Sequence, residues 1–226
     1  MKAACLWSGG KDSCLALWKA MAQGLEVRCL VNFLSAELGR TAFHRVRPDL
    51  IRLQAEALAI PLIQRETASG NHEQVYKGVM RELRTMGVEG LVTGDIDLAE
   101  GRLWVESNCR EFGLKAVMPL WNIAPDEVMG QFIGEGFEAV VVCVRADLFG
   151  GEWLGRKVDR EFVARLHESH CKPGFHICGE NGEYHTLAID GPPFGKRLSV
   201  APGRKVWSDG YGFLEIDHAE LVSKAG

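Results

Sequence analysis

The fold is decided by a short polar run near the N-terminus: Ser8-Gly9-Gly10-Lys11-Asp12-Ser13. The apolar segment Ala3–Trp7 before it predicts a buried strand, and the pattern from about Lys11 to Ala22 after it predicts a helix. Paired glycines let backbone amides approach an anion closely, and the N-terminus of the following helix favours negative charge. The sequence therefore predicts a phosphate-binding turn between the first strand and the first helix.

The side chains of this run also suit phosphate chemistry. Ser8 and Ser13 can donate hydrogen bonds, and Lys11 can neutralise phosphate charge. A carboxylate such as Asp12 suits a phosphate site chiefly as a ligand of Mg²⁺. The alternative interpretation is a simple glycine turn with Asp or Ser as the helix N-cap, which the complete six-residue order disfavours.

Strand-like and helix-like segments alternate along the first 120 residues. Beyond the first helix, apolar runs predict strands at 25–34, 61–65, 90–94 and 115–118, and helical patterns begin at Pro48, His72 and Leu98. This alternation predicts right-handed βαβ units and a parallel sheet covered on both faces. We therefore expect an α/β, Rossmann-like domain over residues 1–120.

The pattern changes after Pro119. A helix is predicted at 125–135 and strands at 139–144, 184–190, 196–200, 204–207 and 212–216. We expect a smaller C-terminal α+β domain over residues 121–226, with an antiparallel element. Periodicity leaves open whether the strand at 139–144 joins the first sheet or this second domain.

The composition narrows the class of protein. The chain has 226 residues, of which 46% are hydrophobic and 25% charged, and no apolar run approaches the length of a membrane span. Seven cysteines are scattered without a disulfide framework, and no secretion signal precedes the first strand, so we expect a cytoplasmic protein. The net charge of −4 makes nucleic acid an unlikely partner.

The run at residues 8–13 differs from the Walker pattern, Gly-x-x-x-x-Gly-Lys-Ser/Thr. It resembles the PP-loop of the N-type ATP pyrophosphatases. In that superfamily a substrate oxygen attacks the α-phosphate of ATP, pyrophosphate leaves, and a nucleophile, often ammonia, then displaces AMP. The resemblance implies that this loop binds ATP. Because we expect the loop to face solvent, replacing Lys11 or Asp12 by Ala should abolish ATP turnover and leave the fold intact.

Further segments resemble the diphthine–ammonia ligase family, from about residue 3 to residue 200. They are Phe43-His44, Glu89-Gly90-Leu91-Val92-Thr93-Gly94-Asp95-Ile96, Trp153-Leu154-Gly155-Arg156 and Gly179-Glu180-Asn181-Gly182-Glu183-Tyr184-His185-Thr186. This resemblance implies an enzyme that adenylates a carboxylate with ATP and then transfers ammonia to it. In archaea and eukaryotes the family's carboxylate is diphthine, a modified histidine on a translation elongation factor. Bacteria lack diphthamide, so a bacterial member would amidate a different carboxylate, such as a small metabolite.

The resemblance also implies which residues form the site. The implied catalytic residues are Lys11, Asp12, Glu180 and Glu183. The implied ATP-binding residues are Ser8, Gly9, Gly10, Lys11, Asp12, Ser13, His44, Gly94 and Asp95, and Asp12 is the implied ligand of Mg²⁺.

Glu180 and Glu183 flank an Asn-Gly pair. Their carboxylates could hold Mg²⁺, receive a proton from ammonium or position a cationic group of the substrate. We favour a positioning role over that of a buried base with a raised pKa, because a glycine-containing turn suits it better. The alternative is an Asn-Gly hairpin turn flanked by solvated glutamates.

Asp95 and Asp97 follow a predicted strand end on the same sheet edge as the loop. They could contact Mg²⁺ or the adenylate, although Asp97 could instead cap the next helix. On that helix, Arg102 and Glu106 have the spacing of an ion pair.

Six histidine and cysteine residues between 167 and 185 raise the possibility of a zinc site: His167, His170, Cys171, His176, Cys178 and His185. Their spacing matches no standard closed zinc site. The only metal that we expect is Mg²⁺ bound with phosphate.

Two other functions share part of this pattern. A PP-loop tRNA-modifying enzyme would have the same loop, but thiolases of that kind typically carry a Cys-x-x-Cys pair and a basic RNA-binding domain, and this chain has neither a Cys-x-x-Cys pair nor a positive net charge. A non-catalytic ATP-binding protein would need no carboxylates on a second domain facing the loop.

Overall fold

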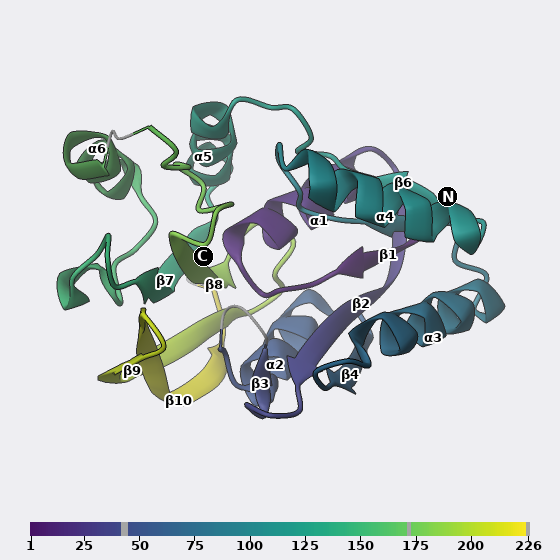
Figure 1. Cartoon of the computed structure of the whole chain (residues 1–226), viewed down its shortest axis with the longest axis horizontal. Helices are drawn as coiled ribbons and strands as arrows, with labels where there is room; N and C mark the ends of the chain where they lie inside the picture. The colour runs from purple at the N-terminus through teal and green to yellow at the C-terminus, as the bar shows by residue number, and fades with distance from the viewer. Residues whose placement is uncertain (42–44, 171–172, 225–226) are drawn as a thin grey trace.

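The computed structural model describes residues 1–41, 45–170 and 173–224. Two β-sheets lie next to each other, each with helices packed against it (Figure 1). Within the described residues, none of the helices combines the length and the apolar composition that crossing a membrane requires. His44, an expected ATP ligand, falls outside the described residues.

The first sheet has six strands: β1 (Lys2–Leu6), β2 (Glu26–Ser35), β3 (Arg40–Thr41), β4 (Leu62–Thr67), β5 (Gly90–Val92) and β6 (Lys115–Val117). The strand order is β3-β2-β1-β5-β6, with β4 also paired to β2. All pairs are parallel except β2 with β3. The first half of the chain is therefore the expected α/β, Rossmann-like sheet.

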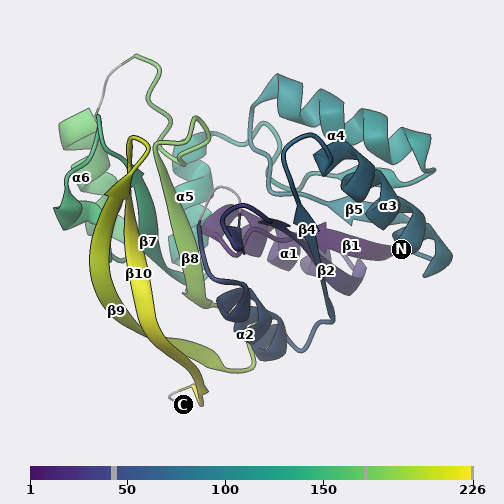
Figure 2. The same ribbon diagram turned by 60° about the horizontal axis from the view of Figure 1, so that its bottom comes forward.

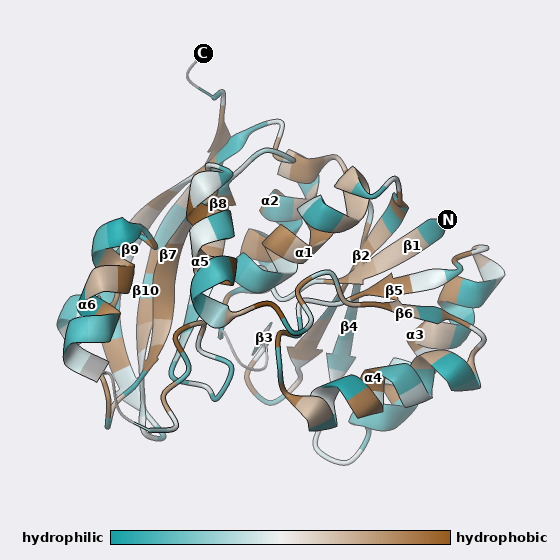
Figure 3. Cartoon of the chain, turned by 90° about the horizontal axis from the view of Figure 1, so that it is seen from above, coloured by the Kyte–Doolittle hydropathy of each residue, from teal (hydrophilic) through white to brown (hydrophobic). Residues whose placement is uncertain are grey.

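Helices cover both faces of this sheet: α1 (Lys11–Ala22), α2 (Pro48–Leu58), α3 (His72–Thr85) and α4 (Ala99–Glu111). The alternation of side chains in β1 separates the two layers, because Ala3 and Cys5 contribute to the core beside α1 and α2, and Ala4 contributes to the core beside α3 and α4. Figure 3 shows the strands between these two pairs of helices. Continuous apolar strands such as β1 fit a sheet that is buried on both faces.

The second sheet is antiparallel, with strand order β8-β7-β10-β9. Its strands are β7 (Glu138–Arg145), β8 (Tyr184–Asp190), β9 (Arg197–Ser208) and β10 (Tyr211–Val222). Helices α5 (Pro125–Gly134) and α6 (Arg160–His170) and a 3₁₀ turn, η1 (Gly151–Trp153), complete this half of the chain. The strand predicted at 139–144 therefore belongs to the second sheet.

One prediction for this half was wrong in detail, and one helix was not predicted. The strands expected at 196–200 and 204–207 form one continuous strand, β9, which curves alongside β10 (Figure 2). We expected Pro202 and Gly203 to interrupt the strand. They do not, because β9 is an edge strand, where a proline needs no hydrogen-bond partner for its nitrogen, and because the pairing with β10 shifts register nearby. Helix α6 was not predicted, although Phe162 and Leu166 bury one side of it.

A buried glutamine on α2 joins the two halves. Gln54 is fully buried, and its side-chain nitrogen donates to the carbonyl oxygens of Gly9 (2.9 Å) and Ala188 (2.7 Å). Its side-chain oxygen accepts a hydrogen bond from the indole nitrogen of Trp7 at 2.9 Å. One amide thus links the end of β1, the phosphate loop and β8.

Replacing this glutamine tests that link. We expect Gln54→Leu to lower the free energy of unfolding by roughly 2–4 kcal/mol, because each buried polar group left without a partner costs about 1–3 kcal/mol. Urea denaturation would measure the loss. The exposed Gln23→Leu, at the C-cap of α1, is the matched control and should stay within about 0.5 kcal/mol of wild type. Equal stability of the two variants would contradict the proposed link.

Candidate active site

The phosphate loop has the backbone geometry that its glycines require. Gly9 has a φ of 84°, and a Cβ atom there would lie 2.6 Å from the side chain of Ile51. Gly10 is the N-cap of α1, and no side chain caps the helix. The interpretation of the run as a turn capped by Asp or Ser is therefore wrong.

The two serines lie side by side in this loop. Their hydroxyl oxygens are 3.1 Å apart, and the amide of Gly10 donates to Ser8 Oγ at 3.2 Å. The amides of Asp12 and Ser13 belong to the first turn of α1, where N–H groups have no carbonyl partner within the helix. Hydroxyl groups and backbone amides at a helix N-terminus form an anion-binding arrangement.

Strand β8 of the second sheet forms the back of the loop. The amide of Ala188 donates to the carbonyl oxygen of Gly9 at 2.8 Å, and the amide of Lys11 donates to Thr186 Oγ1 at 3.0 Å. The loop is therefore positioned by residues that are more than 170 positions away in the sequence.

Lys11 does not face solvent, contrary to the prediction. Its side chain is 3% exposed, donates to Asp12 Oδ2 at 2.9 Å and to the carbonyl oxygen of Cys178, and lies 5.0 Å from the ring centre of Tyr184. Burial favours the neutral amine, but the interactions with Asp12, Tyr184 and Cys178 together outweigh it and raise the pKa of Lys11 above its ordinary value. Lys11 thus ties the segment before β8 to the loop, and its removal should affect the fold.

Three carboxylates from distant parts of the chain lie beside this loop: Asp12, Asp95 and Glu180. Gly94 brings the end of β5 against α1, since a Cβ atom there would lie 2.8 Å from the backbone carbon of Asp12. The amide of Ile96, next to Asp95, donates to Glu180 Oε2 at 3.4 Å. Burial, with the charges of Asp12 and then Asp95, raises the pKa of Glu180 to about 8. The structure therefore brings Glu180 to the phosphate loop as a buried carboxyl group with a raised pKa, which is the environment that the sequence analysis disfavoured.

Asp12 has one unused oxygen in this cluster. Its Oδ2 accepts from Lys11, but Oδ1 is buried and has no hydrogen-bond partner within the described residues. Buried carboxylate oxygens normally have partners, so this atom marks a place where a cation would be stabilised.

Glu183 has a different environment from Glu180. Its side chain is 1% exposed and accepts hydrogen bonds from the amides of His176 (2.8 Å) and Asn181 (3.0 Å). This carboxylate holds the turn that carries Glu180, and its catalytic role stays a prediction. The alternative of a hairpin with solvated glutamates is wrong, since Glu183 is buried and Glu180 is largely so.

His176, which the sequence analysis considered only as a zinc ligand, links the segment before β8 to the segment after β5. His176 Nε2 lies 3.0 Å from Asp97 Oδ2, and the amide of Cys178 donates to His176 Nδ1 at 3.2 Å. Because Nδ1 accepts, Nε2 carries the proton and donates to Asp97. Asp97 therefore does not cap α4, whose N-cap is Leu98.

The remaining predicted features have simpler roles. Arg102 and Glu106 form the expected ion pair at 2.6 Å, and Arg102 also lies over the ring of Trp121. Across the described parts of the chain, no three histidine, cysteine, aspartate or glutamate side chains are grouped to hold a metal ion.

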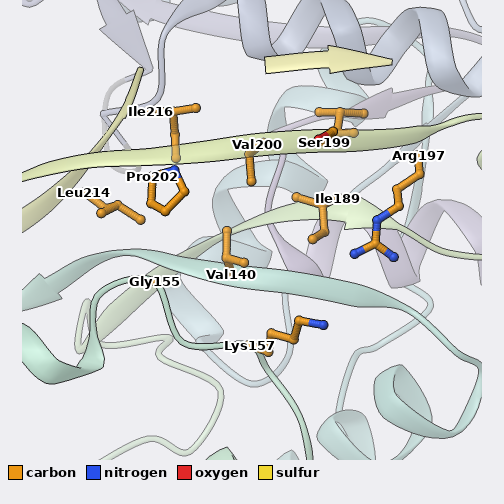
Figure 4. A pocket seen from close by; sticks show the side chains of 11 residues that line it. Val140, Gly155, Lys157, Ile189, Arg197, Ser199, Val200, Pro202, Leu214 and Ile216 are labelled. Carbon is orange, nitrogen blue, oxygen red and sulfur yellow. The ribbon is translucent and has the colours of Figure 1, made fainter. Parts of the chain in front are cut away.

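A separate cavity of about 280 Å³ lies in the second sheet. Val140, Ile189 and Val200 point into it, and Lys157 and Arg197 lie toward one side (Figure 4). Arg197 is paired with Glu138 at 2.7 Å. None of the loop residues or converging carboxylates lines this cavity, so it is not part of the phosphate site.

The fold and the site together are those of an α/β protein with an anion-binding loop, beside which the turn before β8 brings a carboxylate. Comparison with known families identifies the class: residues 1–116 match the diphthamide synthase N-terminal domain, and residues 124–222 match the diphthamide synthase C-terminal domain. The chain belongs to the diphthamide synthase family.

Relatives that are similar in sequence are described as diphthine–ammonia ligases. The diphthine–ammonia ligases of Rattus norvegicus and Homo sapiens are each 30% identical to this chain, with 98% of it and 91% of each relative covered. The ligase of Schizosaccharomyces pombe is 30% identical over 88% of this chain and 36% of its own length. A solved structure, described as a predicted subunit of a tRNA methyltransferase from Methanocaldococcus jannaschii, aligns with a TM-score of 0.46 and 15% identity over 84% of this chain and 97% of its own. By its family, the chain is an ATP-dependent, amide-forming ligase.

The burial of Lys11 leads to a first prediction for this site. We expect Lys11→Met to lower the free energy of unfolding by roughly 1–3 kcal/mol, because Cys178 loses the donor to its carbonyl oxygen and Asp12 loses its counter-ion. Lys115→Met, at an exposed position on β6, is the control and should change stability by less than about 0.5 kcal/mol. Unchanged stability of Lys11→Met would restore the expectation of a lysine that is free to meet phosphate.

The raised pKa of Glu180 leads to a second prediction, for protein free of metal and nucleotide. The folded chain binds this proton more tightly than the unfolded chain, so its stabilising contribution is fully present below about pH 4.5 and is lost as the pH rises through about 8. We expect Glu180→Gln to gain stability relative to wild type between pH 5 and pH 9, as measured by urea denaturation. In an Asp12→Asn background the gain should be smaller and level off at lower pH, because one repelling charge is gone and the folded pKa of Glu180 falls toward 4.5. A difference that stays constant with pH would contradict the burial of this carboxyl group.

Proposed function

We propose that this chain adenylates diphthine on a translation elongation factor and converts the adenylate to an amide with ammonia. The observation that carries the proposal is the meeting of Glu180 with Asp12 and Asp95 beside the phosphate loop. The identities of the two substrates, diphthine and ammonia, are inferred from the similar proteins, which are described as diphthine–ammonia ligases. A small carboxylate metabolite is the alternative substrate if the chain is bacterial.

The phosphate loop would hold the nucleotide. In the proposed first step, a carboxylate oxygen of the substrate attacks the α-phosphorus of ATP, and the bond to the β-phosphate breaks to release pyrophosphate. Ser8, Ser13 and the amides of the first turn of α1 would bind the leaving pyrophosphate, and their grouping at the helix N-terminus supports this role. Asp95 and Gly94 lie next to the loop, where they would face the adenylate.

Mg²⁺ fits the donors that are present. The unpartnered oxygen of Asp12, with Asp95 nearby, offers the one or two carboxylates with which proteins usually bind Mg²⁺ alongside phosphates. When bound, Mg²⁺ neutralises phosphate charge and polarises the phosphoryl group.

Glu180 would act in the second step. Ammonia attacks the carbonyl carbon of the adenylate, the new C–N bond forms as the bond to AMP breaks, and nitrogen loses a proton. Glu180, in the turn before β8, would receive that proton, and the nearby charges of Asp12 and Asp95, which raise its pKa, support this role. We propose this role in place of positioning a cationic group. Glu183 would support it by holding the turn.

The organisation of the chain and its location are part of the proposal. Residues 1–120 would form the ATP-binding domain and residues 121–226 the substrate-binding domain. The two family matches, which end at residue 116 and begin again at residue 124, support this division. Free, buried cysteines such as Cys5 and Cys143 support a reducing cytoplasm.

Partial reactions test the division of labour between the two carboxylate groups. Substrate-dependent exchange of labelled pyrophosphate into ATP reports adenylation, and amide formation reports both steps. We expect Ser13→Ala to lose exchange by about a hundredfold or more, because a donor to the leaving pyrophosphate is removed. We expect Glu180→Gln to keep exchange within about tenfold of wild type and to lose about a hundredfold in amide formation.

Each alternative gives a different result in this assay. Equal losses of exchange and amide formation in Glu180→Gln would assign Glu180 to Mg²⁺ or to the substrate carboxylate. No AMP or pyrophosphate with diphthine-bearing elongation factor, but turnover with a small carboxylate, would replace the substrate. ATP binding without turnover on any carboxylate would indicate a non-catalytic ATP-binding protein.

A further inference from the structure

Four aromatic side chains gather between α3 and α4: Phe33, His72, Tyr76 and Trp104. The ring centres of Tyr76 and Trp104 are 4.5 Å apart, and those of Phe33 and Tyr76 are 5.7 Å apart. Phe33 lies near the carboxyl end of β2, and His72 is the first residue of α3. This aromatic surface is therefore at the same edge of the parallel sheet as the phosphate loop.

Part of this aromatic surface is open to solvent. Trp104 is 41% exposed, and Leu98 and Leu103 beside it in the sequence are 41% and 64% exposed. These are three of the eight large hydrophobic side chains that are exposed in the described structure, and they fall within seven residues. Such a concentration at the edge of a site indicates an interaction surface rather than scattered exposure.

Carboxylates make the surroundings of this surface negative. Asp95 lies against α4, since a Cβ atom at Gly101 would be 3.3 Å from Asp95 Oδ1, and after burial and Cys109 its charge is a further cause of the raised pKa of Tyr76. Two cations on these helices are paired with carboxylates: Lys77 with Glu73 and Glu111, and Arg102 with Glu106. The buried hydroxyl group of Tyr76 has no partner among the described residues, which is unusual outside functional sites.

We propose that this aromatic surface binds a quaternary ammonium group of the substrate. The inference rests on the proposed function, because diphthine carries a trimethylammonium group on the carbon that bears its carboxylate. A quaternary ammonium has no N–H to donate, and it is bound by the faces of aromatic rings and by nearby negative charge.

The position of the surface also suits the reaction. Asp95 lies between the aromatic surface and the loop, since it is close to Tyr76 on one side and follows Gly94, which contacts the backbone of Asp12 and Ser13, on the other. A substrate whose cation lies on Trp104 would have its carboxylate directed toward the loop. Binding of the cation would thus orient the group that is adenylated.

Steady-state kinetics of the full chain test this assignment with ATP, ammonium and diphthine-bearing elongation factor. We expect Trp104→Ala to raise KM for the elongation factor about tenfold or more and to leave KM for ATP unchanged, because one cation–π contact is lost. Trp104→Phe keeps an aromatic face and should recover most of the affinity. Trp207→Ala, an equally exposed tryptophan on β9, should behave as wild type. A normal KM for Trp104→Ala would overturn the proposal.

A small probe separates this inference from the proposed reaction. Choline carries the trimethylammonium group, and 3,3-dimethylbutan-1-ol is its neutral isostere. We expect NMR titration to show choline binding to wild type about tenfold more tightly than the isostere, and Trp104→Ala to abolish that difference. Choline selectivity without any amide formation would retain the surface and remove the proposed reaction. Amide formation with no choline selectivity would retain the proposed reaction and overturn the assignment of the aromatic surface.

Discussion

The contact on which the site depends is the docking of β8 on the phosphate loop. The carbonyl oxygen of Gly9 accepts from the amide of Ala188 and from the buried side chain of Gln54. Both donors hold the backbone in the left-handed conformation that only glycine adopts without strain. A loop that must present amides to an anion is thereby fixed from behind, by a strand of the other sheet, and its open side is left for the ligand.

This docking makes the second sheet part of the nucleotide site. Once β8 is in place, the segment before it brings Glu180 to Asp12, and Lys11 and His176 tie that segment to the first sheet. These two links and the amide of Ile96, which donates to Glu180, hold one turn, so the carboxyl group of Glu180 stays mostly buried in spite of the charges beside it. Bringing like charges together costs free energy, and packing in the rest of the structure offsets it, as is common at functional sites.

The local features of this arrangement could be predicted from the sequence, and the long-range ones could not. Helix α1 and strand β8 begin and end at the predicted residues because glycine, proline and apolar periodicity act over short distances. The direction of Lys11 depends on Cys178, 167 residues away, and the partner of Asp97 is His176, 79 residues away. No periodicity encodes such pairs. The spacing of Glu180 and Glu183 likewise suggested a joint role. The packing instead brings Glu180 to the phosphate loop, whereas Glu183 holds the turn that carries it.

The charge balance of the site follows from the burial of Lys11. A free lysine in the loop would attract phosphate directly, but this lysine is already neutralised by Asp12. The positive potential that remains comes from the N-terminus of α1, which is equivalent to about half an elementary charge. Against it is the charge of Asp95, while the raised pKa of Glu180 keeps that carboxyl group mostly protonated near pH 7, so the site without ligand has no excess of positive charge with which to hold a nucleotide. The nucleotide would have to bring its own cation, and the unused oxygen of Asp12 lies where that cation would be shared between protein and phosphate.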